Sequence, residues 1–344
     1  MDPTTFLSRD DEIRKLEGFK YIHSQSSSSP SLFYTNGRYE RLLDERKIYD
    51  TNLFENVSTI VDPFSQLNQV FILDRGGLVM ANLDAIFDIT HNLTNFESKR
   101  TIDKLTFIDI EGVPGGAIQY LQYRFMRSGG FGFAKRRGYR GSIGWHEIVT
   151  NKVVNNSEFD TTIMGDEMNG DVEVEWELFR DIIMRRYSKG VDLCSYHDNT
   201  KQGVLLCLSV IKQSKDIIIK MKDTVSYDSV LLIHSISALF DKIYLIRLAS
   251  SNKFSSEKYL VCKSKNKLDE EYIEIELSEE FITWITMINN LHIDDELYYI
   301  EEVKKVINGD YRHPYAYDLL KVLTLWHLPD LCVNKLVGYN LVYQ

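Results

Sequence analysis

The chain has 344 residues, of which 44% are hydrophobic and 12% aromatic, and its formal net charge is −10. This composition suits a globular protein with a large core and excludes wholesale disorder. The negative charge argues against broad, non-specific nucleic-acid binding, so any such contact needs a local basic patch, for which residues 135–140 are the candidate. No apolar run approaches the roughly 20 residues that span a bilayer, so we expect no membrane contact.

The first part of the chain predicts an arm followed by an α/β fold. Residues 24–31 are polar and serine-rich and cannot build a core, so residues 1–30 are predicted to form the arm. Apolar spacing then predicts a helix over residues 76–88. Strands are predicted at residues 105–110, 130–134, 191–196, 216–222, 241–249 and 258–264. Helices are predicted at residues 117–126, 174–187, 204–213 and 230–240.

The alternation of strands and helices predicts βαβ units and a mostly parallel sheet with both faces covered. A short loop joins the last two strands, which predicts an antiparallel hairpin at one edge. After residue 265 the sequence becomes acidic and amphipathic and then aromatic, which predicts a helical appendage that either packs on the sheet or docks a partner. The aromatic residues that favour a docking surface are Tyr311, Tyr315, Tyr317 and Trp326. The expected divisions are 1–65, 66–264 and 265–344.

Residues 107–121 predict a strand, a tight turn and a helix in succession. Asp109 lies near the end of the strand, and the turn contains Gly112, Pro114, Gly115 and Gly116. Glycines let the backbone approach a ligand beyond the carboxyl end of a strand, as in the nucleotide pockets of doubly wound folds. The turn lacks the spacing of a dinucleotide fingerprint and the lysine of a phosphate loop. An ordinary turn that binds nothing remains the alternative.

The cysteines do not indicate a metal site or a disulfide scaffold. They are far apart and form no CxxC pair, so buried free thiols are expected. The four positions are Cys194, Cys207, Cys262 and Cys332. The histidines show no ligand spacing either, and we expect no metal.

Several segments together resemble the FtsJ-like ribose 2′-O-methyltransferases, most of all the enzymes that methylate the first transcribed nucleotides of capped mRNA. In chain order these segments are VFILDRGGLVMANLD, FIDIEGVPGG, GFGF, DIIIKMK and SSEKYLVCKSK. The resemblance covers about residues 70–264. It implies a Rossmann-like methyltransferase fold, S-adenosylmethionine as the cofactor, and the capped 5′ end of mRNA as the substrate.

The resemblance also implies which residues hold the cofactor. The turn from Gly112 to Gly116 would wrap the methionine part of S-adenosylmethionine, with Asp109 beneath it. Val113 stands where the cap enzymes most often have glycine. Asp171 falls near the family's adenine-side aspartate, although a surface acidic loop explains it equally well.

The family's catalytic set is Lys-Asp-Lys-Glu, in which a lysine of lowered pKa contacts the ribose hydroxyl and the other members orient and tune it. By resemblance, Lys220 is that lysine and Glu257 is the glutamate. A strand-end lysine and a turn glutamate on solvated edges are the alternative interpretation. The first lysine of the set is replaced by Val79, which can neither carry charge nor donate a hydrogen bond.

The aspartate of the set should close the strand at residues 191–196. An ungapped alignment places His197 there, and a one-residue bulge would bring Asp198 into register, so Asp198 is the predicted third catalytic residue. If His197 holds the position instead, we expect the site to be inactive.

The sequence thus predicts a cap-specific mRNA 2′-O-methyltransferase or a degenerate homologue of one. The alternative is an inactive methyltransferase-fold subunit that binds protein or RNA in an mRNA-capping or transcription assembly. The composition is rich in Ile, Asn, Lys and Tyr and suits a virus or a cytoplasmic genetic element. We therefore expect a cytoplasmic location, in the host cytoplasm or the virion for a virus, while a nuclear location stays open.

Overall fold

The computed structural model describes residues 33–35, 37–50, 52–62, 64, 74–90, 105–125, 128–136, 159–160, 164–166, 172–266, 276–310 and 319–328. Within these ranges, no helix combines the length and apolar character needed to cross a membrane. The same ranges contain no group of three or more His, Cys, Asp or Glu side chains that could hold a metal ion. Cys194, Cys207 and Cys262 are buried free thiols, whereas Cys332 lies outside the described residues.

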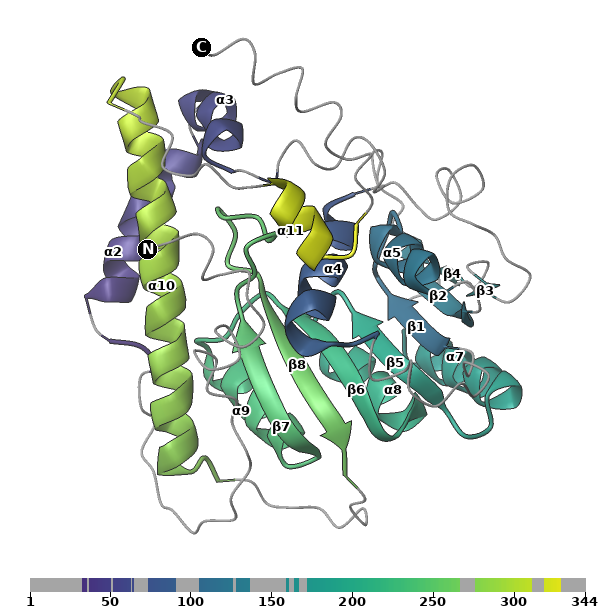
Figure 1. The fold of residues 1–344 in the computed structure, drawn as a ribbon. Coiled ribbons are helices and arrows are strands. Elements are labelled where there is room, and N and C mark those ends of the chain that lie inside the picture. Colours follow the sequence, from purple (N-terminus) through teal and green to yellow (C-terminus); the bar gives the residue numbers. More distant parts are fainter. Residues whose placement is uncertain are drawn as a thin grey trace.

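An eight-stranded sheet forms the centre of the fold, with the order β3-β2-β1-β5-β6-β8-β7 and with β4 paired to β2 (Figure 1). The strands are β1 (Leu105–Ile110), β2 (Ser128–Arg136), β3 (Phe159–Asp160), β4 (Met164–Asp166), β5 (Val191–Tyr196), β6 (Ile211–Met221), β7 (Phe240–Ile246) and β8 (Lys258–Lys265). All neighbours pair in parallel except β8, which runs antiparallel to both β6 and β7. The mostly parallel sheet and the antiparallel hairpin at one edge are confirmed, with β7 outermost.

The boundary between the helix predicted at residues 204–213 and the strand after it was wrong. The segment at residues 204–213 was expected to be helical throughout, but α8 (Lys201–Val210) ends at Val210 and β6 begins at Ile211. Ile211 pairs with Val191, and the next pair is Leu193 with Asp216, so the ladder shifts register between them. This pairing with β5 draws the β-branched Ile211 into the sheet, and an apolar run alone does not reveal such a change.

Helices cover both faces of the sheet (Figure 1). The first face carries α4 (Arg75–Phe87), α5 (Gly116–Arg124) and α11 (Leu319–Leu325), whose buried side chains share one apolar cluster with Phe107, Ile218 and Tyr259. The second face carries α7 (Val172–Arg186), α8 and α9 (Tyr227–Ser237), which share another cluster with Ile108, Ile219 and Met221. Because side chains alternate along a strand, β1, β5, β6, β7 and β8 each contribute to both clusters.

A 29-residue helix, α10 (Glu279–Ile307), stands along the β7 edge of the molecule (Figure 1). Its first half packs into the second-face core through Phe281, Ile285 and Ile288. Its second half contacts the N-terminal elements, which are α2 (Arg38–Glu45), η2 (Arg46–Asp50) and α3 (Asn52–Val61). The division of the chain at residues 65 and 264 remains a prediction.

The aromatic residues near the C-terminus do not all face outward. Trp326 is 1% exposed and stacks on Phe64 with 5.1 Å between ring centroids, so the expectation that it forms part of an exposed docking surface is wrong. Its burial follows from the packing of α11 on the first face of the sheet. Tyr311, Tyr315 and Tyr317 lie outside the described residues, as do residues 1–30 and 137–140.

Candidate functional site

Asp109 lies beneath the turn that follows β1, as the sequence predicted. Its side chain is completely buried, and its Oδ1 lies 2.8 Å from Nε2 of His197. Its Oδ2 is buried without a hydrogen-bond partner among the described residues. A buried carboxylate oxygen normally accepts a hydrogen bond, so this atom is a candidate acceptor for a ligand.

Gly112 is required because of Asp109. A Cβ at position 112 would lie 2.2 Å from Oδ2 of Asp109, so only glycine lets the turn close over the carboxylate. The peptide bond between Val113 and Pro114 is cis, and Gly115 takes φ +116° as the N-cap of α5. The four predicted turn residues and Asp109 therefore lie together at the carboxyl end of β1.

A second carboxylate, Asp74, also faces this turn and was missed by the sequence reasoning. It caps α4, accepting from the main-chain N–H of Gly77 at 3.3 Å, and it accepts from the N–H of Gly116 at 3.2 Å. Burial raises the pKa of Asp74, while hydrogen bonds from three glycine N–H groups oppose that rise. The available signal was an aspartate directly before the start of a predicted helix, which is a typical N-cap pattern.

The carboxylates of Asp109 and Asp74 suit a cationic ligand. The buried carboxylate of Asp109 lies against Gly112, and the half-buried carboxylate of Asp74 contacts Gly116 at the start of α5. One Asp109 oxygen has no partner within the described part of the chain. S-adenosylmethionine carries a positively charged ammonium group and a sulfonium group, both of which such carboxylates would attract. The residues present therefore fit this cofactor at the turn. Asp171, the predicted adenine-side residue, lies outside the described residues.

Lys220 and Glu257 come together at the neighbouring edge of the sheet. The Lys220 Nζ lies 2.5 Å from Oε2 of Glu257, and both side chains are largely buried. Lys220 is the penultimate residue of β6 and pairs with Tyr259 of β8, two residues after Glu257. The antiparallel pairing of β6 and β8 thus creates the ion pair.

His197, rather than Asp198, continues the strand register beside Lys220. Tyr196 pairs with Ile219, and the main-chain N–H of His197 still donates to the carbonyl of Ile110 at 2.9 Å, which extends the ladder by one residue. The register shift in β5 lies at its start, between Val191 and Leu193, not at its end. The imidazole therefore shares a face with Asp109 and Lys220.

The Asp198 carboxylate pairs with a different lysine. Its Oδ1 lies 2.9 Å from Nζ of Lys222, two residues beyond Lys220, and also accepts from the N–H of Asn199. Of the three residues predicted as catalytic, the structure brings Lys220 and Glu257 together and places Asp198 with Lys222. The bulge that would have moved Asp198 into register is not observed at this end of β5.

The contacts of His197 do not form a nucleophilic relay. Ser195 Oγ lies 3.1 Å from the same Nε2 atom that contacts Asp109. A Ser-His-Asp relay needs the serine and the aspartate on opposite ring nitrogens. The arrangement therefore fixes the ring of His197 without activating Ser195.

Val79 offers no substitute for the missing lysine. Its side chain is 3% exposed and lies within the apolar cluster on the first face of the sheet. An isopropyl group in that environment can only contribute packing.

Sequence comparison relates the chain to methyltransferases that act on mRNA caps, although no family model matches it. It is 26% identical over 254 residues to cap-specific mRNA (nucleoside-2′-O-)-methyltransferase 1 of Mus musculus, which covers 63% of this chain and 29% of the mouse protein. It is 24% identical over 294 residues to the Ailuropoda melanoleuca protein of the same name, and the match covers 77% of this chain and 34% of that protein. The inactive cap-specific methyltransferase 1B of Caenorhabditis briggsae is 22% identical over 277 residues, covering 67% and 32%.

The chain therefore spans about a third of the length of the curated relatives it matches. Among solved structures, human methyltransferase-like protein 13 with S-adenosylhomocysteine matches with a TM-score of 0.30 and 10% identity, over 72% of this chain and 96% of that one. MycE methyltransferase matches with a TM-score of 0.31 and 18% identity, over 59% of this chain and 54% of that one. TM-scores this low do not establish a shared fold, so the fold is assigned from the strand order of the sheet. The sequence matches confirm, at the level of the family, the resemblance to cap-specific mRNA 2′-O-methyltransferases.

Proposed function

We propose that the chain is a degenerate homologue of the cap-specific mRNA 2′-O-methyltransferases. It binds S-adenosylmethionine at the turn after β1 and the capped 5′ end of mRNA beside it, and its methyl transfer is far slower than that of a complete catalytic set. The observation that carries this proposal is the position of His197, an imidazole tied to Asp109 where the family has an aspartate. The retained Lys220–Glu257 pair and the carboxylates at the turn support the shared ancestry of the site.

Different residues serve cofactor binding and methyl transfer. When bound, S-adenosylmethionine supplies an electrophilic methyl group. Asp109 and Asp74 would hold its positive charge, and Glu257 orients the ammonium group of Lys220 toward a ribose hydroxyl. His197 is committed to Asp109 and Ser195, and Val79 is apolar, so neither supplies the carboxylate or the second ammonium group of the family's set. Loss of members of a cooperating set costs several powers of ten in rate.

A second candidate function is a non-catalytic subunit that binds a protein of an mRNA-capping or transcription assembly in the cytoplasm. The exposed side chains Met287, Leu291 and Tyr298 favour it, since they follow one stripe of α10 at helical spacing. The inactive relative in Caenorhabditis briggsae is consistent with a member of this group that does not transfer methyl groups.

Two measurements test the first proposal. Calorimetry with S-adenosylmethionine should show binding, and the absence of binding would overturn both the enzyme and the cofactor-bound interpretation. Transfer of radiolabelled methyl to a capped oligoribonucleotide should be slow and should disappear in Lys220→Ala. Lys242→Ala, which removes a lysine from strand β7, is the matched control and should keep the wild-type rate. Transfer at the rate of a complete enzyme would contradict the assignment of His197.

A pull-down from the native source separates the second candidate. Capture of a capping or transcription protein that is lost on Leu291→Asp, while S-adenosylmethionine binding stays intact, would favour the subunit role. A protein that remains a monomer without partners would count against it.

A further inference from the structure

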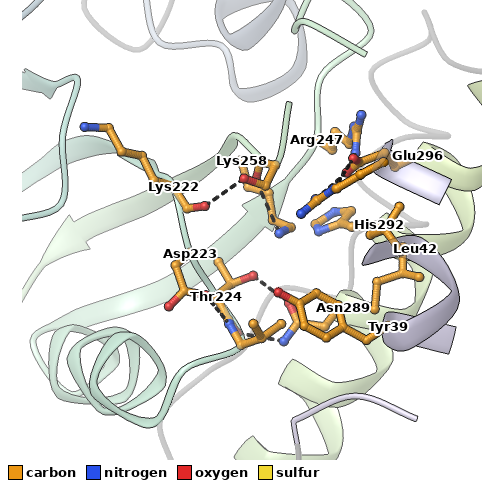
Figure 2. Close-up of a pocket in the computed structure, with 14 residues that line it drawn as sticks. Tyr39, Leu42, Lys222, Asp223, Thr224, Arg247, Lys258, Asn289, His292 and Glu296 are labelled. Atoms are coloured by element: carbon orange, nitrogen blue, oxygen red, sulfur yellow. Dashed lines mark hydrogen bonds and ion pairs between the residues drawn. The ribbon is translucent and has the colours of Figure 1, made fainter. Parts of the chain in front are cut away.

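A small cavity lies beyond the carboxyl end of β6, on the second face of the sheet, between the β6–α9 loop, α10 and α2 (Figure 2). Its volume is about 180 Å³. Pockets for drug-sized ligands measure roughly 300–1,000 Å³, so only a small group would fit here. Residues that line it include Tyr39, Arg46, Asp223, Lys258, His292 and Glu296.

The cavity is separate from the candidate methyl-transfer site. Lys258 pairs with Met221, whose side chain belongs to the second-face core. Tyr259, opposite Lys220, belongs to the first-face core. Because side chains alternate along β6 and β8, the cavity and the Lys220–Glu257 pair lie on opposite faces of the sheet.

Lys258 brings a buried positive charge to the cavity without an ion-pair partner in the described residues. The side chain is 7% exposed, and its Nζ makes only a long hydrogen bond, 3.4 Å, to the carbonyl of Ser256. Burial lowers the pKa of Lys258 to about 8. A buried ammonium group without a counter-ion is costly, so a ligand that supplies negative charge would be stabilised here.

The carboxylates around the cavity are already engaged. Glu296 accepts from Arg46, Arg247 and Tyr49. Asp223 accepts from the N–H groups of Val225 and Ser226 and from the hydroxyl of Ser229 at the start of α9. Asp295 pairs with Arg247 at 3.1 Å. Glu296 and Asp295 are therefore paired with arginines, whereas Asp223 has only neutral donors. Asp223 and Glu296 attract the charge of Lys258 from a distance, but the Lys258 Nζ itself contacts only a carbonyl oxygen among the described residues.

His292 supplies a second unsatisfied group beside Lys258. Its Nδ1 is buried without a hydrogen-bond partner in the described part of the chain. Burial, and then the charges of Lys258 and Arg247, hold the pKa of His292 well below its usual range. A neutral imidazole can carry its proton on Nδ1 and donate it to an oxyanion. Figure 2 shows the Lys258 ammonium group next to the His292 ring, whereas the Lys222 side chain points away from both.

We propose that this cavity binds a phosphate group, held by Lys258 and His292. A lysine ammonium group is a common phosphate ligand, and the volume admits one phosphate with a few water molecules. The phosphate would come either from the free ion or from the 5′-phosphate end of an RNA. The site is independent of methyl transfer.

Titration of the full chain with inorganic phosphate, followed by calorimetry, tests the proposal. The wild type should bind phosphate saturably in the millimolar range or tighter, and Lys258→Met should weaken binding at least tenfold. Lys253→Met is the matched control, because burial also lowers the pKa of Lys253 to about 8, yet its Nζ donates to the carbonyl of Leu248. Binding in this control should stay within twofold of the wild type. No saturable binding, or equal losses in both variants, would overturn the proposal.

A second arm identifies the source of the phosphate and covers misfolding of the variant. A preference for a 5′-phosphorylated over a 5′-hydroxyl oligoribonucleotide, removed by Lys258→Met, would support an RNA end, and binding of the inorganic ion alone would support free phosphate. If Lys258→Met does not fold, phosphate should shift the NMR signals of the Lys258 ammonium and His292 ring in the wild type, and unchanged signals would overturn the proposal. S-adenosylmethionine binding should be unaffected by Lys258→Met, so the two proposals fail separately.

Discussion

The turn after β1 and the edge formed by β5, β6 and β8 differ in how much of their chemistry they retain. At the turn, the buried Asp109 lies against Gly112 and the half-buried Asp74 contacts Gly116, and every glycine position that the resemblance requires except Val113 is filled. At the strand edge, only the Lys220–Glu257 pair has the residue types that methyl transfer needs. On the proposed function, binding of a methyl donor would therefore be separable from use of its methyl group in this fold.

The two regions are also physically linked. His197 continues β5 at the strand edge, yet its ring contacts Asp109 beneath the turn. A catalytic aspartate at position 197 would place a second carboxylate near Asp109, so the exchange to histidine replaces repulsion with a hydrogen bond. On the proposed function, a histidine at this position would thus weaken the chemistry while stabilising the binding region.

The largest effect is expected at Asp109. Asp109→Asn removes the buried negative charge that faces the turn, and the affinity for S-adenosylmethionine should fall about a hundredfold, or about 2.7 kcal/mol. Calorimetry measures the change. Asp192→Asn is the control, because Asp192 is also a partly buried carboxylate of this sheet but contacts Thr106 and Lys212 away from the turn. Equal losses in both variants would show that the turn is not the binding region.

The next effect concerns the shape of the turn. Gly112→Ala places a methyl group against the Asp109 carboxylate, and the free energy of unfolding should fall by about 2 kcal/mol as the turn shifts. Chemical denaturation measures it. Gly309→Ala has open space around its Cβ and should cost about 1 kcal/mol, from the left-handed backbone alone. A Gly112→Ala protein as stable as the wild type would mean that the carboxylate does not occupy the turn.

The comparison is sharpened by restoring the lost carboxylate. His197→Asp should raise methyl transfer to capped RNA about tenfold above background, because an aspartate in register with Lys220 can orient and tune its ammonium group. Labelled methyl incorporation is the measurement. Asparagine has a shape similar to that of aspartate but no charge, so His197→Asn should not raise the rate of methyl transfer. Equal rates for the two variants would contradict the assigned position.

The smallest effect is expected at Asp198. Its carboxylate pairs with Lys222, which is 56% exposed, so Asp198→Asn should change stability by less than about 1 kcal/mol and methyl transfer by less than twofold. Denaturation and the transfer assay measure both. A large loss of transfer would restore Asp198 as a catalytic residue.

The sequence predicted six of the eight strands, because these strands contain apolar segments bounded by turns, and it missed the short β3 and β4. Leu105–Ile110 is buried on both faces, and a run of this kind favours a central parallel strand. The start of β6 was missed because residues 204–211 are apolar except for Ser209 and suit a helix as well as a strand. The direction in which Asp198 points depends on the register at the end of β5, which local spacing does not determine.

Asp74 and the phosphate cavity show a different limit. Asp74 contacts Gly116 across 42 positions, and the cavity joins residues of α2 to residues of β8 and α10. Contacts between such distant positions depend on how the elements pack. No periodic pattern in a single segment encodes them.

The position of α10 has a consequence for dissecting the protein. Its first half fills the second-face core, and its second half holds Arg46 through the buried carboxylate of Glu296. A fragment limited to residues 66–264 would lack α10, which shares an apolar cluster with Leu245 and Phe240. The apolar surface exposed in this way would cause the fragment to aggregate, although it contains the whole sheet. Trimming experiments should therefore keep residues 33–50 and the long helix together.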